Sequence, residues 1–238
     1  MNSVIRSYRE SLKGFNITYK ESDLFIVADN KLKKKAYLSL LKYRRIIEQH
    51  IEENPEFLTS LKPLKFYSEN IEEILDSMYF AGISAGVGPF AAVAGAIAEF
   101  VAKDLKEYSE DILVENGGDI YIFGKKDKFI QVYLPGFNNI GIKIDKNLLP
   151  IGICSSSSKI GHSLSFGKAE LVVVLSKSGA LADAFATKIC NKLKKEDDLE
   201  LVINEYKKNK KIEGCILFFK KRIAGWGKFE LIKTTLEK

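Results

Sequence analysis

The chain has 238 residues, of which 46% are hydrophobic and 29% charged, with a formal net charge of +6. This balance is typical of a folded domain and excludes a disordered chain, and a mild basic excess without a reading motif predicts no nucleic-acid partner. The three cysteines, Cys154, Cys190 and Cys215, are odd in number and far apart, which excludes a disulfide framework and a cysteine-based zinc site.

The first half of the chain predicts a hairpin followed by helices. The N-terminal segment lacks an apolar signal core and a lipid-attachment cysteine, so we expect a cytoplasmic protein. Residues 15–19 and 24–28 predict the two strands of a hairpin. Helices are expected at residues 33–51, which are amphipathic, at 71–80, and at 89–105, where Pro89 suits a first helical turn.

The stretch from Met78 to Ala98 has no charged residue and is long enough to span a membrane. Glycines and Pro89 interrupt its first third, and the rest is mainly alanine, with few of the Leu and Ile residues that drive membrane insertion. We therefore expect a buried helix entered through a glycine-rich loop, and no membrane partner.

The second half predicts short strands separated by Gly, Asn, Asp or Pro turns. These strands are expected at residues 111–114, 120–123, 129–134, 140–144, 152–155 and 171–175. Helices at 179–193 and 197–206 follow, and then a closing hairpin of strands 215–219 and 229–232 on either side of Gly225-Trp226-Gly227. Runs of strands separated by a helix cluster indicate an α+β fold, and we expect a single domain over residues 1–238.

Asp183 and Thr187 are four residues apart in a predicted helix, so their side chains project from the same face. Both have alanine neighbours, which leave room for a ligand or another backbone. A carboxylate and a hydroxyl suit Mg²⁺, which takes one or two protein groups and completes its shell with phosphates and water. Alternatively, the helix dipole alone favours Asp183 in an early turn, and the Thr187 hydroxyl bonds back to the carbonyl of Asp183.

The glycine-rich run that opens the alanine-rich helix contains Gly86 and Gly88. Because a helix N-terminus presents unpaired amides, these glycines are candidates for binding a phosphate. The run is neither a Walker loop nor a dinucleotide fingerprint, because no Gly-Lys-Ser/Thr follows and no suitable strand precedes it. Tight packing of small residues explains the run equally well.

Asn116, Gly117, Gly118 and Asp119 join two predicted strands. The bare backbone of the two glycines can contact a ligand, so all four residues are candidates for cofactor binding. Asn-Gly is also an ordinary hairpin signal, and a plain tight turn is the alternative.

A run of hydroxyl side chains follows the strand predicted at residues 152–155. Its candidate cofactor-binding residues are Ser155, Ser156, Ser157, His162 and Ser163. Hydroxyls and loop amides can hold a pyrophosphate or a flavin edge, and an ordinary polar loop is the alternative. None of these serines has the spacing of a nucleophile elbow or of a Ser-His-Asp triad. The other histidine, His50, is expected at the surface of the amphipathic helix.

Taken in order, these segments resemble the ApbE-like superfamily, in particular its uncharacterised cytoplasmic branch. The resemblance extends from residue 22 to residue 227. It rests on the runs AGVGP (residues 85–89), AAVAGAIAE (91–99), VENGGDI (114–120), GHSLSFGK (161–168) and ADA (182–184). It implies one ApbE-like domain in which short-stranded sheets pack with a buried Ala/Gly-rich helix and flanking helices.

Characterised ApbE proteins are Mg²⁺-dependent flavin transferases that cleave FAD and attach FMN through its phosphate to a threonine of a target protein. The resemblance implies that Asp183 and Thr187 bind the metal at the FAD pyrophosphate, and that Asp183 is the catalytic carboxylate. It also implies that the Gly117-Gly118-Asp119 turn and the serine–histidine loop line the flavin nucleotide site. The resemblance therefore implies two partners, a small-molecule nucleotide and a protein acceptor.

This chain departs from the transferases at three places. They carry a lysine beside the helix-opening glycine, where this chain has Ser84 and Ala85 before Gly86. They have a His-x-x-Asp-Pro segment, which is altered after His162, and they prefer glycine where Ser158 stands.

These departures leave three functions open. The first is phosphoryl transfer or pyrophosphate cleavage with FAD or a related flavin nucleotide and Mg²⁺. The second is binding of a flavin or another anionic metabolite without catalysis, and the third is an oligomeric scaffold with a vestigial pocket. The sequence names neither the ligand nor the acceptor, and it leaves the oligomeric state open, a homo-oligomer included.

Overall fold

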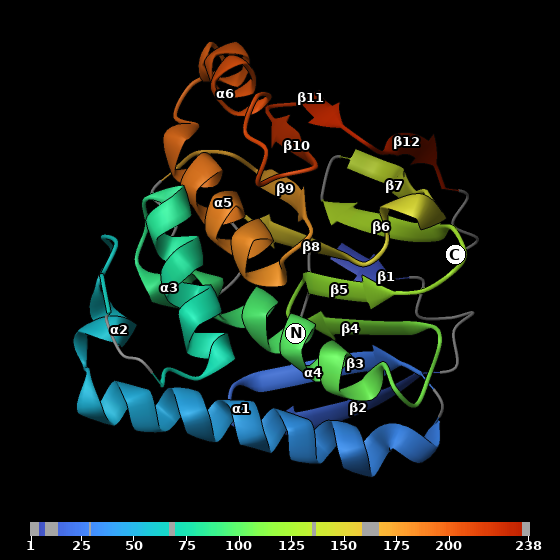
Figure 1. Ribbon diagram of the computed structural model, residues 1–238. Helices are drawn as coiled ribbons and strands as arrows, with labels where there is room; N and C mark the ends of the chain where they lie inside the picture. Colours follow the sequence, from blue (N-terminus) through green and yellow to red (C-terminus); the bar gives the residue numbers. More distant parts are fainter. Residues whose placement is uncertain are drawn as a thin grey trace.

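The computed structural model describes residues 5–7, 14–28, 30–66, 70–134, 137–158 and 167–234. The candidates His162 and Ser163 lie outside these residues. The described chain forms three layers, in which helices cover one face of a large sheet and a smaller sheet covers the other (Figure 1). Helices and short-stranded antiparallel sheets are thus segregated, and the α+β prediction is confirmed.

The large sheet has eight antiparallel strands, in the order β11-β10-β9-β8-β5-β4-β3-β2. Their bounds are Gly14–Tyr19 (β2), Ser22–Val27 (β3), Ile112–Asn116 (β4), Asp119–Phe123 (β5), Ile151–Ser156 (β8), Leu171–Ser176 (β9), Gly214–Phe219 (β10) and Arg222–Gly227 (β11). The small sheet has the order β1-β6-β7-β12. Its strands are Ile5–Ser7 (β1), Lys128–Leu134 (β6), Phe137–Ile144 (β7) and Glu230–Lys233 (β12).

Five α-helices and a short turn of helix form the layer that covers the large sheet. Their bounds are Lys33–Glu53 (α1), Glu56–Thr59 (α2), Glu73–Ala85 (α3), Val93–Leu105 (α4), Gly179–Lys192 (α5) and Asp198–Tyr206 (α6). The 3-10 helix η2, Pro89–Ala92, joins α3 to α4. Within the described residues no single helix is long and apolar enough to cross a membrane. The pair α3 with η2 and α4 meets that test only together, and it is bent by 107°.

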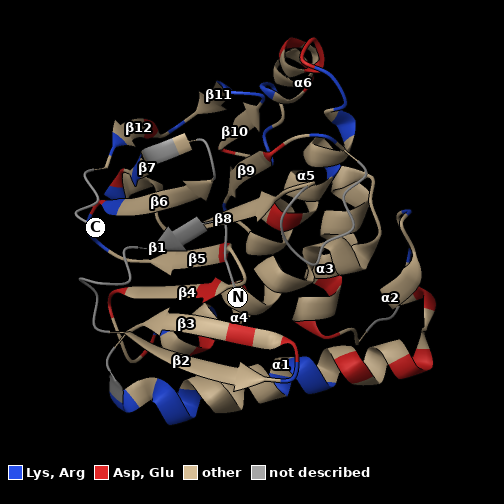
Figure 2. Cartoon of the chain, turned by 180° about the vertical axis from the view of Figure 1, so that it is seen from behind, with Lys and Arg blue, Asp and Glu red and all other residues tan. Residues whose placement is uncertain are grey.

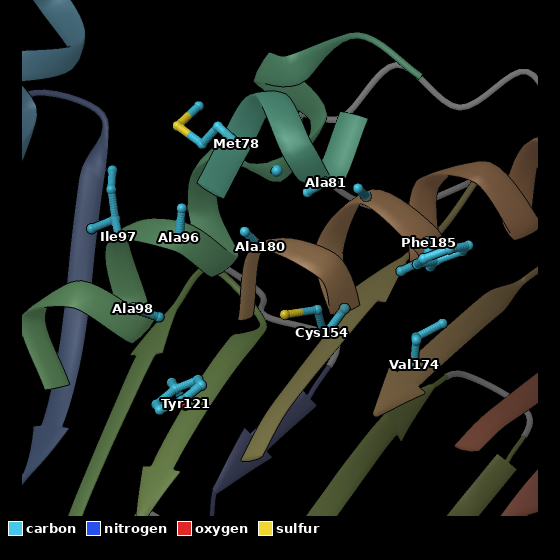
Figure 3. Close-up of a cluster of buried hydrophobic side chains, with 14 of the residues drawn as sticks. Met78, Ala81, Ala96, Ile97, Ala98, Tyr121, Cys154, Val174, Ala180 and Phe185 are labelled. Atoms are coloured by element: carbon cyan, nitrogen blue, oxygen red, sulfur yellow. The ribbon is translucent and has the colours of Figure 1, made fainter. Parts of the chain in front are cut away.

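The central strands of the large sheet, such as β4, β9 and β10, are buried on both faces, which explains their runs of continuous apolar residues. In β9, Val172 and Val174 pack in the helix-side core, while Leu171, Val173 and Leu175 pack against the small sheet. This alternation follows from the two-residue period of a strand. Figure 3 shows the helix-side core, where small residues of α3, α4 and α5 lie close over the sheet.

Helix α1 forms one edge of the helical layer, with basic residues concentrated over its N-terminal half and acidic residues toward its end (Figure 2). The expectation that His50 is a surface residue is wrong, because His50 is only 6% exposed. Its Nε2 lies 2.8 Å from the hydroxyl of Tyr79. The rings of Phe57 and Phe66 meet it edge-on, so His50 belongs to an aromatic cluster between α1, α2 and α3.

The predicted closing hairpin pairs the wrong strands. Strand β10 pairs with residues 222–227, so Gly225-Trp226-Gly227 lies inside β11, and residues 230–233 form an edge of the small sheet. The tight turn between β10 and β11 consists of Lys220 and Lys221, both with positive φ (45° and 63°). Such turns normally carry Gly, Asn or Asp, so two lysines gave no turn signal.

Candidate functional site

Helices α4 and α5 contact each other through the backbone of two glycines. A Cβ atom on Gly95 would overlap the carbonyl of Gly179, and a Cβ atom on Gly179 would overlap the carbonyl of Gly95. Gly152 of β8 also lies close, since its Cβ would stand 2.7 Å from the Cα of Gly179. These three glycines let the start of α5 press against both α4 and the sheet.

Asp183 caps the N-terminus of α4 from the neighbouring helix. Its Oδ2 accepts a hydrogen bond of 3.0 Å from the backbone N–H of Gly95, and the N–H of Ala94 donates to the same carboxylate. The local N-cap residue of α4, Ala92, offers no side-chain cap. The dipole of α4, as well as that of α5, therefore favours the negative charge of Asp183.

Glu99 of α4 caps α5 in return. Its Oε2 accepts hydrogen bonds from the N–H of Gly179 at 2.7 Å and from the hydroxyl of Ser178 at 3.0 Å. Its Oε1 forms an ion pair of 2.9 Å with Lys103. Each helix thus supplies a carboxylate to the other's first turn. Sequence reasoning missed this role of Glu99, because its partners lie about 80 residues away in the chain.

The predicted turn between β4 and β5 is attached to the same place. Gly117 and Gly118 both have positive φ (65° and 110°), as a two-residue hairpin turn requires. The Asn116 amide donates to the carbonyl of Ala94 at 3.2 Å. Asp119 Oδ1 accepts from the N–H of Ser155 at 3.0 Å. The structure therefore brings this turn, β8 and the start of α4 together.

Asp119 and Asp183 are neighbouring buried carboxylates, 8% and 7% exposed. Burial raises the pKa of Asp119 to about 7, although the hydrogen bond from Ser155 opposes this rise. Burial, and then the charge of Asp119, raise the pKa of Asp183 well above its usual value. Cys154 lies beneath the first turn of α5 (Figure 3), with its Sγ 3.4 Å from the carbonyl of Gly179. Its pKa rises because of burial and then because of the two aspartates.

Thr187 and Ser156 contribute hydroxyl groups further along α5 and β8 from the contact between Gly179 and Gly152. From Gly179 to Thr187 the helix advances about 12 Å, and from Gly152 to Ser156 the strand advances about 13 Å. Because the first members of these two series are in contact, Ser156 comes at the level of Thr187. Both residues are buried. Among the described residues the Ser156 hydroxyl has no hydrogen-bond partner, so it can form a hydrogen bond with a ligand that reaches it.

The serines on either side of Ser156 already have partners. The hydroxyl of Ser155 donates to the carbonyl of Gly118 at 3.3 Å. The hydroxyl of Ser157 donates to the carbonyl of Glu170 at 2.6 Å. Of the three serines predicted to bind a cofactor within the described residues, Ser156 is thus the one whose hydroxyl remains available.

The glycine-rich run before η2 has structural tasks. Gly86 ends α3 with φ 73°, a left-handed conformation that favours glycine. A Cβ on Gly88 would overlap the carbonyl of Ser60, so Gly88 is required for close packing. Sequence reasoning found no base beside Gly86. The structure brings one there from α5, because Lys188 Nζ lies 3.2 Å from the Gly86 carbonyl oxygen.

The donor atoms of this site fit Mg²⁺ better than zinc. Among the described residues, no group of three or more His, Cys, Asp or Glu side chains surrounds a common point, as a closed zinc site would need. Two carboxylates and two hydroxyls at Asp119, Asp183, Thr187 and Ser156 are hard oxygen donors. Mg²⁺ uses one or two such groups and takes its other ligands from phosphates and water.

Comparison with known proteins gives a family and a fold. The family model described as "AbpE bacteria" matches residues 6–207. The UPF0280 protein MJ1526 of Methanocaldococcus jannaschii is 40% identical over 228 residues, covering 92% of each chain. The UPF0280 protein of Methanococcus vannielii is 35% identical over 231 residues, covering 93% of each. The ApbE protein of Thermotoga maritima superposes with a TM-score of 0.56 at 13% identity, covering 93% of this chain and 96% of that one.

Proposed function

This chain belongs to the ApbE-like family that includes the archaeal UPF0280 proteins, and on that premise we propose that it binds a flavin nucleotide, FAD foremost, together with Mg²⁺ and acts at its pyrophosphate. The resemblance to the ApbE proteins supports the choice of flavin. The observation that carries the proposal is the pairing of buried Asp183 and Thr187 one helical turn apart, next to Asp119.

The charge balance of the site supports a cation. The capping carboxylate of Glu99 has its own ion pair with Lys103. Within the described residues, neither Asp119 nor Asp183 has an ion pair of this kind, although both are buried. Burying carboxylates together without a cation costs several kcal/mol. A divalent cation bound between these side chains and a phosphate would offset that cost.

The side chains suit phosphoryl chemistry. In the proposed step, an acceptor hydroxyl forms a bond to the phosphorus of the FMN half, the bridging P–O bond breaks, and AMP leaves. The hydroxyl proton passes to the Asp183–Asp119 pair, with Asp183 as the catalytic carboxylate. A carboxylate beside the acceptor hydroxyl can take up its proton as a general base. Mg²⁺, when bound, neutralises charge on the transferring phosphoryl group.

The test of the proposed site uses Asp183→Asn rather than alanine. The amide oxygen can still accept from Gly95, so the cap of α4 is retained while the charge is lost. We expect calorimetry to show at least a tenfold loss of Mg²⁺-dependent FAD affinity. The matched control is Glu99→Gln, a buried capping carboxylate of the same helix pair, which should alter stability and leave the affinity unchanged. Unchanged FAD affinity in Asp183→Asn would contradict the proposal.

A binding protein without catalysis is the second candidate. It is favoured because the described part of the site contains no histidine, and because both aspartates already accept hydrogen bonds from backbone amides. Incubation with FAD and Mg²⁺, followed by chromatography for AMP and FMN, separates the two candidates. Sustained release of AMP eliminates the binding-only function, whereas saturated binding without AMP release eliminates the transferase.

A further inference from the structure

Lys188 is a half-buried cation without a carboxylate partner among the described residues. Its ammonium group donates to the carbonyl of Gly86 at 3.2 Å. The next lysine on the same face of α5, Lys192, instead forms an ion pair with Glu205. Lys103, which borders the same helix pair, is paired with Glu99. Lys188 therefore differs from these two lysines because no described carboxylate neutralises its charge, and two of its three N–H donors have no acceptor among the residues that the structure describes.

The helix ends near the site cannot supply positive charge to an anionic ligand. Helix N-termini commonly bind phosphates. Here Glu99 occupies the N-terminus of α5, and Asp183 occupies the N-terminus of α4. A phosphate placed beside these two carboxylates is therefore repelled unless cations offset them. Besides a bound metal, such a cation has to come from a side chain.

Lys188 is placed to be that cation. It follows Thr187 directly and lies about 7.5 Å along the helix axis from Asp183. Asp183 contacts the first turn of α4, just after η2, and Lys188 contacts Gly86, just before η2. Helix α5 thus runs along η2, with the carboxylate near one end and the ammonium near the other. Five residues also turn the helix by about 140°, so one diphosphate contacts both groups when the long side chain of Lys188 swings from the Gly86 carbonyl toward Asp183.

We propose that Lys188 binds a phosphate of the nucleotide ligand on the side of the diphosphate away from Asp119, while Asp183 and Thr187 hold the metal. The proposal rests on the proposed function and adds to it a second group that binds the diphosphate, whose charge is then shared between the metal and Lys188. The contact of Lys188 with Gly86 orients the ammonium when no ligand is bound.

The test compares Lys188→Met with Lys192→Met. Both changes remove one positive charge from the same face of α5 and leave most of the apolar stem. Calorimetry with FAD and, separately, with inorganic pyrophosphate, each with Mg²⁺, measures affinity. Lys188→Met should bind both probes roughly ten- to a hundredfold more weakly, as expected for a lost charged hydrogen bond. Lys192→Met should stay within about threefold of the wild type, because its charge is already paired.

Metal binding distinguishes a role of Lys188 in phosphate binding from a structural role. Mn²⁺ binding followed by electron paramagnetic resonance, without nucleotide, should be no weaker in Lys188→Met, because the lost charge only repelled the metal. Affinity for the two probes within threefold of wild type in Lys188→Met would overturn the proposal. So would an equal loss in Lys192→Met, or a loss that disappears when the assay temperature is lowered far below the thermal midpoint.

The two probes also separate this proposal from the one on which it rests. If the wild type binds Mg²⁺-pyrophosphate in a Lys188-dependent way and does not bind FAD, the flavin assignment fails and the role of Lys188 stands. If FAD binds and Lys188→Met binds it equally well, the role of Lys188 fails and the flavin site stands. Binding of neither probe would overturn both.

Discussion

Gly95→Ala tests whether the contact between α4 and α5 builds the site. The added Cβ would overlap the carbonyl of Gly179 and lie 2.8 Å from the Cβ of Asp183. Neither neighbour is the end of a flexible side chain, so the helices must separate and weaken the hydrogen bond from Gly95 to Asp183. Overpacking costs about 1–3 kcal/mol, and a hydrogen bond to a charged group contributes about 1.5–3 kcal/mol.

Alanine itself favours a helix over glycine by about 1 kcal/mol, so the net destabilisation is about 1.5–5 kcal/mol. For a chain of this length, that corresponds to a decrease of roughly 3–20 °C in the thermal midpoint. Differential scanning calorimetry measures this shift, and calorimetric titration with FAD and Mg²⁺ should show a parallel loss of affinity because Asp183 moves.

Gly117→Ala is the matched control for Gly95→Ala. Its Cβ would meet no atom within 4 Å, and only the positive φ of 65° causes strain, of about 1–2 kcal/mol. We therefore expect a smaller shift in the thermal midpoint. If the Gly95→Ala midpoint lies within 2 °C of the wild type or above it, the close contact between the helices is not as tight as described.

Two further predictions follow. Burial lowers the pKa of His50 below 6.5, so the unfolded chain binds more protons, and stability should be lost as the pH falls below about 6.5. Thermal midpoints between pH 7.5 and 5 should therefore fall more for the wild type than for His50→Gln, and parallel curves would contradict this cause. Ser156→Ala removes a buried hydroxyl that has no hydrogen-bond partner in the described part of the chain, so its thermal midpoint should equal or exceed that of the wild type. Its affinity for FAD with Mg²⁺ should decrease, and unchanged affinity would place Ser156 outside the site.

Local signals predicted most of the elements. The hairpin of β2 and β3, the long helix α1 and the buried strand β9 each carry their own periodicity, and they lie where that periodicity indicates. The buried face of α1 was less predictable. Leu38 is 54% exposed, whereas Ser39 is buried and donates to Asp104 at 2.8 Å. The packing partner, and not the hydrophobicity of each residue, decides which stripe of the helix faces the core.

The candidate site was predictable only in part. The spacing of Asp183 and Thr187 indicated a shared helix face, and the Asn-Gly turn indicated a hairpin. The approach of Lys188 to Gly86 and of Glu99 to Gly179 depends on how α5 packs against α3 and α4. Residues 80 to 102 positions apart make these contacts, so no pattern within a short window reports them.

The reciprocal caps also determine when the site can assemble during folding. The hydrogen bonds from Gly95 to Asp183 and from Gly179 to Glu99 join residues 88 and 80 positions apart. Contacts of such high sequence separation form late, because a long loop must close before they contribute any stability. During synthesis, the first turn of the alanine-rich helix α4 therefore stays uncapped until α5 has left the ribosome. Nascent chains that end before residue 179 leave the face of α4 that packs on α5 uncovered, and apolar surface exposed in this way favours aggregation.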